Sequence, residues 1–153
     1  DITERRRAEK LRAAQYATIH ILSESATISQ AGSKILPALC ESLGWDVGEI
    51  WTPDQYLGTS GRANGSDRIS TLLRCVELWV RPSLSIPEFI NVTWQSTFAP
   101  GVGLPGHIWE TRSPHWINDV VDDANFPLAY FASQAGLHGA FGFPILGDSE
   151  VLG

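Results

Sequence analysis

The chain has 153 residues, 43% hydrophobic and 18% charged, which is the size and composition of one ordinary globular domain. Its net charge of −6 argues against a nucleic-acid or membrane-surface role, because both polyanions would repel it. It has no apolar run of about 18 residues and no signal-peptide pattern, so we expect a cytoplasmic protein. Cys40 and Cys75 are too few for a disulfide framework and are expected to be buried as small hydrophobic side chains.

Residues 2–25 predict one long helix, because the stretch lacks Gly and Pro and is rich in Ala, Arg, Glu and Leu. Its first half is charged, and its apolar positions form a seam of Leu11, Ala14, Thr18 and Ile21 and a second stripe of Tyr16, Ile19 and Leu22. Two interpretations stay open. The helix either belongs to the core, or it is a connector that continues from an upstream domain and pairs with its copy in a dimer.

Residues 27–44 predict a second helix. TISQ supplies Thr27 as N-cap with Gln30 three residues later, Pro37 should bend the middle, and Gly44 should end it. A short strand is expected from Val47 to about residue 53, followed by a polar loop at 58–67. Residues 68–80 then predict a long strand that pairs with the first as a hairpin.

The second half predicts shorter elements. These are a helix around residues 87–93, one or two helical turns at 107–113, a strand at 115–121, a helix at 127–136, a strand at 139–146 and a tight turn at 147–150. The order of elements predicts an α+β fold with an antiparallel sheet.

The sequence GVGLPG, residues 101–106, matches the G-x-G-x-x-G pattern of phosphate-binding loops. Such a loop needs a buried strand before it and a lysine to meet the phosphate charge. Here QSTFAP precedes it, and both lysines, Lys10 and Lys34, come earlier in the chain. We therefore expect that these glycines allow positive φ angles and close packing of the chain before the short helix.

Four stretches occur in an order that resembles the GAF domain, a sensory module of bacterial signalling proteins. They are LCESLGWDVGEIW, LRCVELWVRP, FAPGVGLPGHIWETRSPHWINDVVDDANFP and AGLHGAFGFPIL. The version in multi-domain cyanobacterial and other bacterial histidine kinases is the most similar, and ERRRAEKLR resembles the linker that follows a PAS domain. The resemblance divides the chain into a linker or signalling helix, residues 1–25, and a GAF-like sensor domain, residues 26–153.

The resemblance implies a GAF-like five- or six-stranded antiparallel sheet. The two long helices would cover one face, short helices and loops would cover a pocket on the other, and the C-terminal strand and helix would be truncated. The implied function is a regulatory sensory module of a histidine kinase, which binds a small ligand or relays a conformational signal through its N-terminal helix to a dimeric output module. The alternatives are a ligand-free dimerisation or spacer module and a free methionine sulfoxide reductase.

The resemblance also implies the partners: a second copy bound through the N-terminal helix, and neighbouring PAS, GAF or kinase domains of the same chain. We expect no nucleic-acid or membrane partner. The fragment itself is expected to have no catalytic residue, its full-length parent being a protein-histidine kinase.

Aromatic side chains dominate the segment that would cover the pocket, residues 84–132, and the last strand. The pocket candidates are Phe89, Phe98, Trp109, Trp116, Phe126, Phe131, Phe141 and Phe143, and Trp94 belongs to the same segment. Such side chains also serve as core, so both interpretations stay open.

Cofactor chemistry is expected to be absent. The resemblance implies that a relative with a covalent bilin would have Cys near Pro127, His near Leu128 and Asp near Gly103, and all three are missing here. A metal site could draw on His107, His115 and His138 with Asp119, Asp122 or Asp123. Their spacing matches no known motif, so we predict no metal site and name no ligand.

Overall fold

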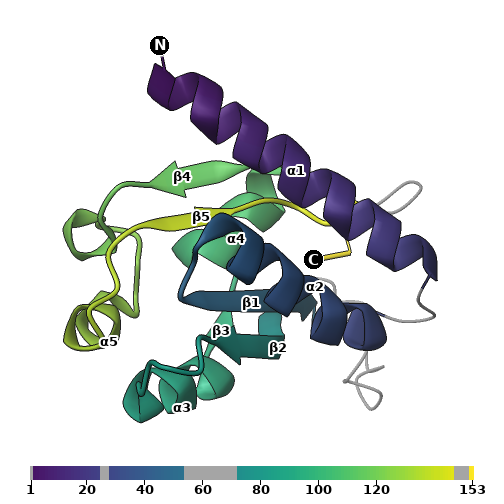
Figure 1. Ribbon diagram of the computed structural model, residues 1–153. Helices are drawn as coiled ribbons and strands as arrows, with labels where there is room; N and C mark the ends of the chain where they lie inside the picture. Colours follow the sequence, from purple (N-terminus) through teal and green to yellow (C-terminus); the bar gives the residue numbers. More distant parts are fainter. Residues whose placement is uncertain (1, 25–27, 54–71, 147–151) are drawn as a thin grey trace, which may run out of the picture. The chain divides into compact units, whose positions relative to one another are not determined.

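The computed structural model of the chain describes residues 2–24, 28–53, 72–146 and 152–153 (Figure 1). The helices are α1 (Ile2–Glu24), α2 (Ile28–Leu43), α3 (Pro87–Gln95), α4 (Gly103–Thr111) and α5 (Ala129–Gln134), with a 3-10 turn, η4, at Val120–Asp122. The strands are β1 (Val47–Pro53), β2 (Leu73–Val80), β3 (Thr97–Phe98), β4 (His115–Ile117) and β5 (Ala140–Gly142).

The chain forms two compact units. The first unit contains Asp1–Ile50 and Val76–Ser85, and the second contains Trp51–Cys75 and Ile86–Gly153. Strands β1 and β2 therefore contribute residues to both units. None of the described helices is long and apolar enough to span a bilayer.

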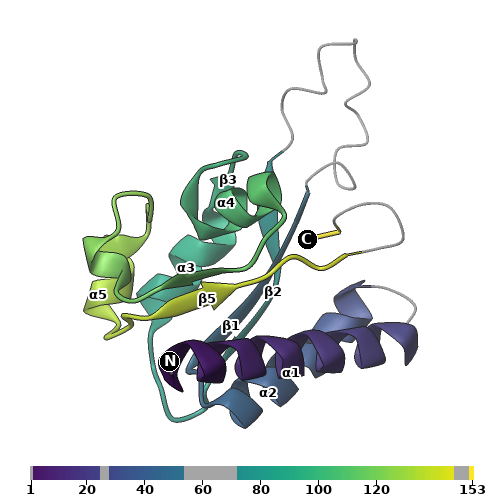
Figure 2. The same cartoon turned by 90° about the horizontal axis from the view of Figure 1, so that it is seen from above.

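The first unit is built on α1 and α2, which pack side by side (Figure 2). The predicted seam of α1 is confirmed at Ala14 and Thr18, both buried, whereas Tyr16 of the second stripe is 76% exposed. The Thr18 hydroxyl donates a hydrogen bond to the Ala14 carbonyl oxygen at 2.7 Å, within the same helix. The side chains of Ile19, Ile21 and Leu22 lie outside the described residues.

Helix α2 ends as the sequence predicts. Gly44 has a φ of +77°, and its amide and that of Trp45 both donate to the Cys40 carbonyl oxygen at 2.9 Å. Pro37 lies inside the helix, and the expected cap Thr27 lies outside the described residues. A Cβ atom at Gly32 would meet Ile50 of β1 at 2.9 Å, so the missing side chain allows α2 to pack closely on the strand.

Five strands are described, but they form two sheets instead of the expected single sheet. One has the order β1-β2-β3, and the other pairs β4 with β5. Strand β2 pairs antiparallel with β3, Leu73 opposite Phe98, and β4 pairs antiparallel with β5, Trp116 opposite Phe141. The prediction of an α+β fold with antiparallel strands is therefore confirmed.

Strands β4 and β5 and helix α5 are shorter than predicted, whereas helix α3 extends past the predicted 87–93 to Gln95. The strand expected at 115–121 ends at Ile117, because the Asp119 side chain caps η4 by accepting the Val121 amide at 3.0 Å. Helix α5 occupies only part of 127–136. Strand β5 stops at Gly142 before Pro144, which cannot donate to a sheet, and Ile145 instead donates to the Gly153 carbonyl at 2.7 Å.

Three predicted features cannot be compared with the structure. The polar loop at 58–67, the start of the second strand at 68–71 and the turn at 147–150 all lie outside the described residues.

Candidate functional site

The G-x-G-x-x-G segment is the start of α4, and each glycine has a separate structural reason. Gly101 and Gly103 have φ angles of +84° and +69°, in the left-handed region that favours glycine. Gly106 has no room for a side chain, because its Cβ would collide with the backbone carbonyl oxygen of Ala99. The helix begins inside the motif instead of after it, four residues earlier than the sequence predicted.

The backbone amides of this segment are already bonded to the protein. Gly101 N donates to the Gly106 carbonyl at 2.8 Å and Val102 N donates to the Ala99 carbonyl at 3.0 Å. Gly103 N donates to Oδ1 of Asn125 at 3.0 Å, and Nδ2 of Asn125 donates back to the Gly101 carbonyl at 3.0 Å. A phosphate loop needs such amides free to point at the anion, so this segment is a packed turn, as the sequence predicted.

The aromatic candidates fall into separate groups. Phe98 of β3 is buried and lies against Trp51 of β1, with ring centroids 4.9 Å apart and planes at 46°. The Phe98 ring also fills the space beside Gly103, 3.1 Å from where a Cβ atom would stand. These contacts place Phe98 in the core of the second unit, and Phe89 of α3 is buried too.

A second group lies on the β4–β5 pair. Trp116 and Phe141 are opposite each other in the register and stack with centroids 4.0 Å apart at 18°. Phe143 follows at 5.6 Å from Phe141. All three side chains are half-buried, so the stacked rings are partly exposed to solvent.

The remaining aromatic candidates do not join either group. Trp109 and Phe126 are half-buried, and Phe131 makes an edge contact with Tyr130 at 5.3 Å. Trp94 is 43% exposed, so it does not belong to a buried lining. The structure therefore brings together three of the eight candidates, Trp116, Phe141 and Phe143.

The histidines of the second unit form two separate pairs. Nδ1 of His138 lies 3.2 Å from Oδ1 of Asp119, whereas His107 and His115 face each other with ring centroids 4.4 Å apart. Asp123 is used in a turn, where its Oδ1 accepts the Asn125 amide at 2.7 Å. Within the described part of the chain no three His, Cys, Asp or Glu side chains gather as metal ligands.

Asp119 has two partners on one oxygen. The Val121 amide and the His138 ring both hold its pKa below the usual value, the amide being the larger cause. The carboxylate thus caps η4 and at the same time contacts the chain just before β5.

Comparison with known proteins decides the family. The sequence model of the GAF domain matches residues 25–153. The chain belongs to the GAF domain family. Among solved structures, it resembles the GAF domain from a phosphoenolpyruvate-protein phosphotransferase (ptsP) of Coxiella burnetii, with a TM-score of 0.57 and 19% identity over 94% of this chain and 73% of that chain. It also resembles the A. aeolicus nlh2 GAF domain in an inactive state, with a TM-score of 0.59 and 18% identity over 95% and 76%. None of the curated proteins compared with it matches in sequence.

Both cysteines of this GAF domain are free thiols in buried positions. Burial raises the pKa of Cys40 to about 11, although the nearby positive charge of Arg81 acts in the opposite direction. A thiol needs to ionise before it can act as a nucleophile, so Cys40 is poorly suited to thiol chemistry. Its sulfur instead fills the space beside Gly48 of β1.

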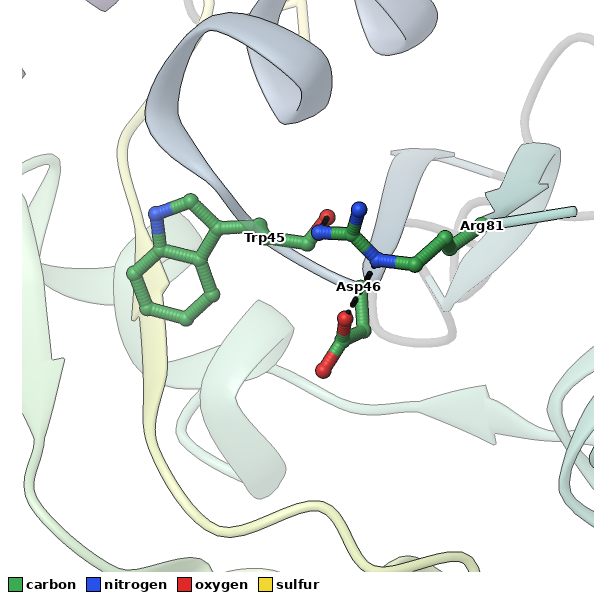
Figure 3. A network of polar contacts seen from close by, with 3 residues as sticks. All are labelled: Trp45, Asp46 and Arg81. Carbon is green, nitrogen blue, oxygen red and sulfur yellow. Dashed lines mark hydrogen bonds and ion pairs between the residues drawn. The ribbon is translucent and has the colours of Figure 1, made fainter. Parts of the chain in front are cut away.

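A polar network joins the entry of β1 to the exit of β2 in the GAF domain (Figure 3). Nε of Arg81 contacts Oδ1 of Asp46 at 2.7 Å, and Nη2 donates to the Trp45 carbonyl at 3.3 Å. The Arg81 amide donates to the Asp46 carbonyl at 2.8 Å. Because its partners are the local backbone and one carboxylate, the Arg81 guanidinium serves structure at this place. Sequence reasoning did not single out this network or Asn125, since neither stands in a recognisable motif.

Proposed function

We propose that this GAF domain is a regulatory sensory module that relays a conformational signal through α1 to a dimeric output module, such as a histidine kinase. The observation that carries the proposal is the shape of the α1 contact. Between residues 2 and 18, only Ala14 and Thr18 are buried. With 23 residues, α1 is a rod about 34 Å long, and over residues 2–18 it is held along one narrow seam.

A rod of this kind can move as a rigid body at low cost, because few packed side chains have to be rearranged. Strands β1 and β2 contribute residues to both units, so a change in the second unit can reach the first along these strands. A ligand shifts such an equilibrium only when it binds one conformation better than the other.

The ligand-binding part of the proposal rests on Trp116, Phe141 and Phe143. Their stacked, half-buried rings offer the flat apolar surface that a small planar or apolar ligand would contact. A thermal-shift panel of nucleotides, haem and amino acids tests this part. A ligand that raises the melting temperature of the wild type but not of Trp116→Ala supports the sensor, and a uniformly null panel favours the spacer module.

Dimerisation through α1 is the second part of the proposal. Ile2 and Tyr16 are 64% and 76% exposed on this helix, and a second copy would cover apolar side chains of this kind. Sedimentation velocity should therefore show a dimer that Tyr16→Glu weakens. Tyr130→Glu is the matched control, because Tyr130 is 66% exposed on α5 and the same change there should leave the dimer intact. A wild-type monomer at high concentration would rule out this part.

We place the module in the cytoplasm, beside PAS, GAF or kinase domains of the same chain, and assign it no catalytic step of its own. The sulfoxide reductase alternative requires reactive thiols, and the burial of Cys40 and Cys75 speaks against it. A sulfoxide reduction assay in which the wild type is active and Cys40→Ser or Cys75→Ser is inactive would restore that alternative.

A further inference from the structure

We propose that His107 and His115 form a binding site for a divalent transition-metal ion, Cu²⁺ or Ni²⁺, with the remaining positions filled by water or a small ligand. The two imidazoles lie with ring centroids 4.4 Å apart and planes tilted by 47°. Both side chains are half-buried, so part of each residue is exposed to solvent. The inference is independent of the proposed sensory function.

The nitrogens of this pair are available. Across the described residues, neither imidazole has a hydrogen bond or an ion pair, and the contact between the two rings is the interaction they share. His138 differs, because Asp119 already occupies its Nδ1. Neutral imidazole nitrogen is a preferred ligand for Zn²⁺, Cu²⁺ and Ni²⁺, so two unpaired imidazoles in contact are suited to chelate one ion.

The ring separation allows both imidazoles to reach one ion. With a metal to nitrogen distance of about 2.0 Å and a further ~1.2 Å to the ring centre, each centroid would lie about 3.2 Å from a shared ion, so the two centroids can be at most about 6.4 Å apart. The observed separation of 4.4 Å lies within this limit. Among the divalent ions that imidazole binds, Cu²⁺ is held most tightly, and Ni²⁺ is also held well.

The scaffold holds the two rings at this separation. His115 lies on β4 opposite Gly142 of β5 in the antiparallel register. A Cβ atom at Gly142 would collide with Ile108 of α4, so the missing side chain allows α4 to approach the strand. Ile108, the residue that follows His107, is buried. Its packing therefore also fixes the backbone position of His107. Both ligands therefore come from packed elements, as a preformed site requires.

The sequence offered His107 and His115 among possible metal ligands, but their spacing matches no metal motif, so it predicted no site. The fold brings them together and leaves His138 with Asp119. A two-histidine site leaves coordination positions open, so moderate affinity and exchangeable outer ligands are expected.

The experiment is isothermal titration of the metal-free chain with Cu²⁺ and Ni²⁺. Wild type and the control His138→Gln should each bind one ion per chain with equal affinity, because His138 lies outside the pair. His107→Gln and His115→Gln should each bind at least about tenfold more weakly. His20→Gln, in α1, is a second control that should match the wild type. Circular dichroism of the metal-free variants checks that each one folds.

Electron paramagnetic resonance of the Cu²⁺-loaded wild type gives a readout that needs no variant. Hyperfine splitting from two imidazole nitrogens is expected. The proposal is overturned if the wild type binds neither ion, if His107→Gln and His115→Gln bind as tightly as the wild type, if His138→Gln loses the site, or if the spectrum lacks nitrogen coupling.

Discussion

Oδ1 of Asn125 accepts a hydrogen bond from the Gly103 amide at 3.0 Å, across 22 positions of the chain. Because Nδ2 of the same side chain donates to the Gly101 carbonyl, one amide group bridges the turn that opens α4. Gly103 is buried, and Asn125 supplies the acceptor for its amide. The bridge converts a sequence that resembles a phosphate loop into a closed structural turn.

Asn125→Ala should lower the free energy of unfolding by about 0.5 to 1.5 kcal/mol, because it removes the hydrogen bond at the part-buried Gly103 amide. Asn125→Asp keeps the acceptor for the Gly103 amide and removes the donor to the Gly101 carbonyl. It should therefore lower the free energy of unfolding by less than Asn125→Ala does. Urea denaturation measures both. Asn91→Ala, at an exposed position of α3, is the control, and its free energy of unfolding should be close to that of the wild type. Equal stability of Asn125→Ala and wild type would contradict the bridge.

Gly106→Ala should destabilise the domain about twice as much as Gly136→Ala, a net ~2 kcal/mol against ~1 kcal/mol. Alanine inside a helix gains about 1 kcal/mol over glycine, but the new Cβ would collide with the Ala99 carbonyl, and such overpacking costs about 3 kcal/mol. Gly136 has a φ of +78° and open space around it, so alanine there costs only about 1 kcal/mol. Thermal melting of the two variants compares them, and the reverse order would refute this assignment of the glycines.

Asp119 should make stability fall in acid. Its folded-state pKa is held below the usual 3.8 by the Val121 amide and His138. The folded protein therefore binds this proton less readily than the unfolded chain does, and the stabilisation is complete above about pH 5 and disappears as the pH falls through the folded-state pKa. Asp119→Asn retains the capping oxygen but does not titrate.

Urea denaturation between pH 6 and pH 2.5 measures this effect. As the pH falls, the free energy of unfolding should decrease more steeply for the wild type than for Asp119→Asn. His138→Gln removes the second cause and should give an intermediate slope. Parallel curves for wild type and Asp119→Asn would show that the carboxylate gains nothing from its two partners.

Cys40 should be unreactive in the folded domain. With a pKa of about 11, about one thiol in a thousand is ionised at pH 8, and burial blocks access as well. In a Cys75→Ala background, where Cys40 is the remaining thiol, a disulfide reagent at pH 8 should react only after urea is added. Rapid labelling of the native protein would mean that Cys40 is accessible.

The sequence predicted those features that depend on neighbouring residues. Helix α1 follows from the lack of Gly and Pro, and Gly44 ends α2 because glycine accepts a positive φ. Strand β5 was predicted too long, because Ile145 pairs with residue 153 instead of extending the strand, and that pairing is set by the fold.

The sequence predicted that aromatic side chains would form the candidate site, but it did not predict which of them contact one another. Phe98 and Trp116 looked alike in sequence, yet one is buried against Trp51 and the other stacks on Phe141. Trp51 was assigned only to a strand, since its partner lies far along the chain. The contact between His107 and His115 likewise depends on the close packing at Gly142, which no local pattern reveals.

The hydrogen bond from Thr18 to the Ala14 carbonyl has a consequence for how α1 can move. Thr18 is the buried polar residue of the seam, and its hydroxyl is satisfied inside its own helix instead of across to α2. At this point a sliding or rotating α1 breaks no interhelical hydrogen bond and gives up only dispersion contacts, which re-form in a neighbouring register. Thr18 therefore allows α1 to slide or rotate against α2, whereas a hydroxyl bonded to α2 would oppose that movement.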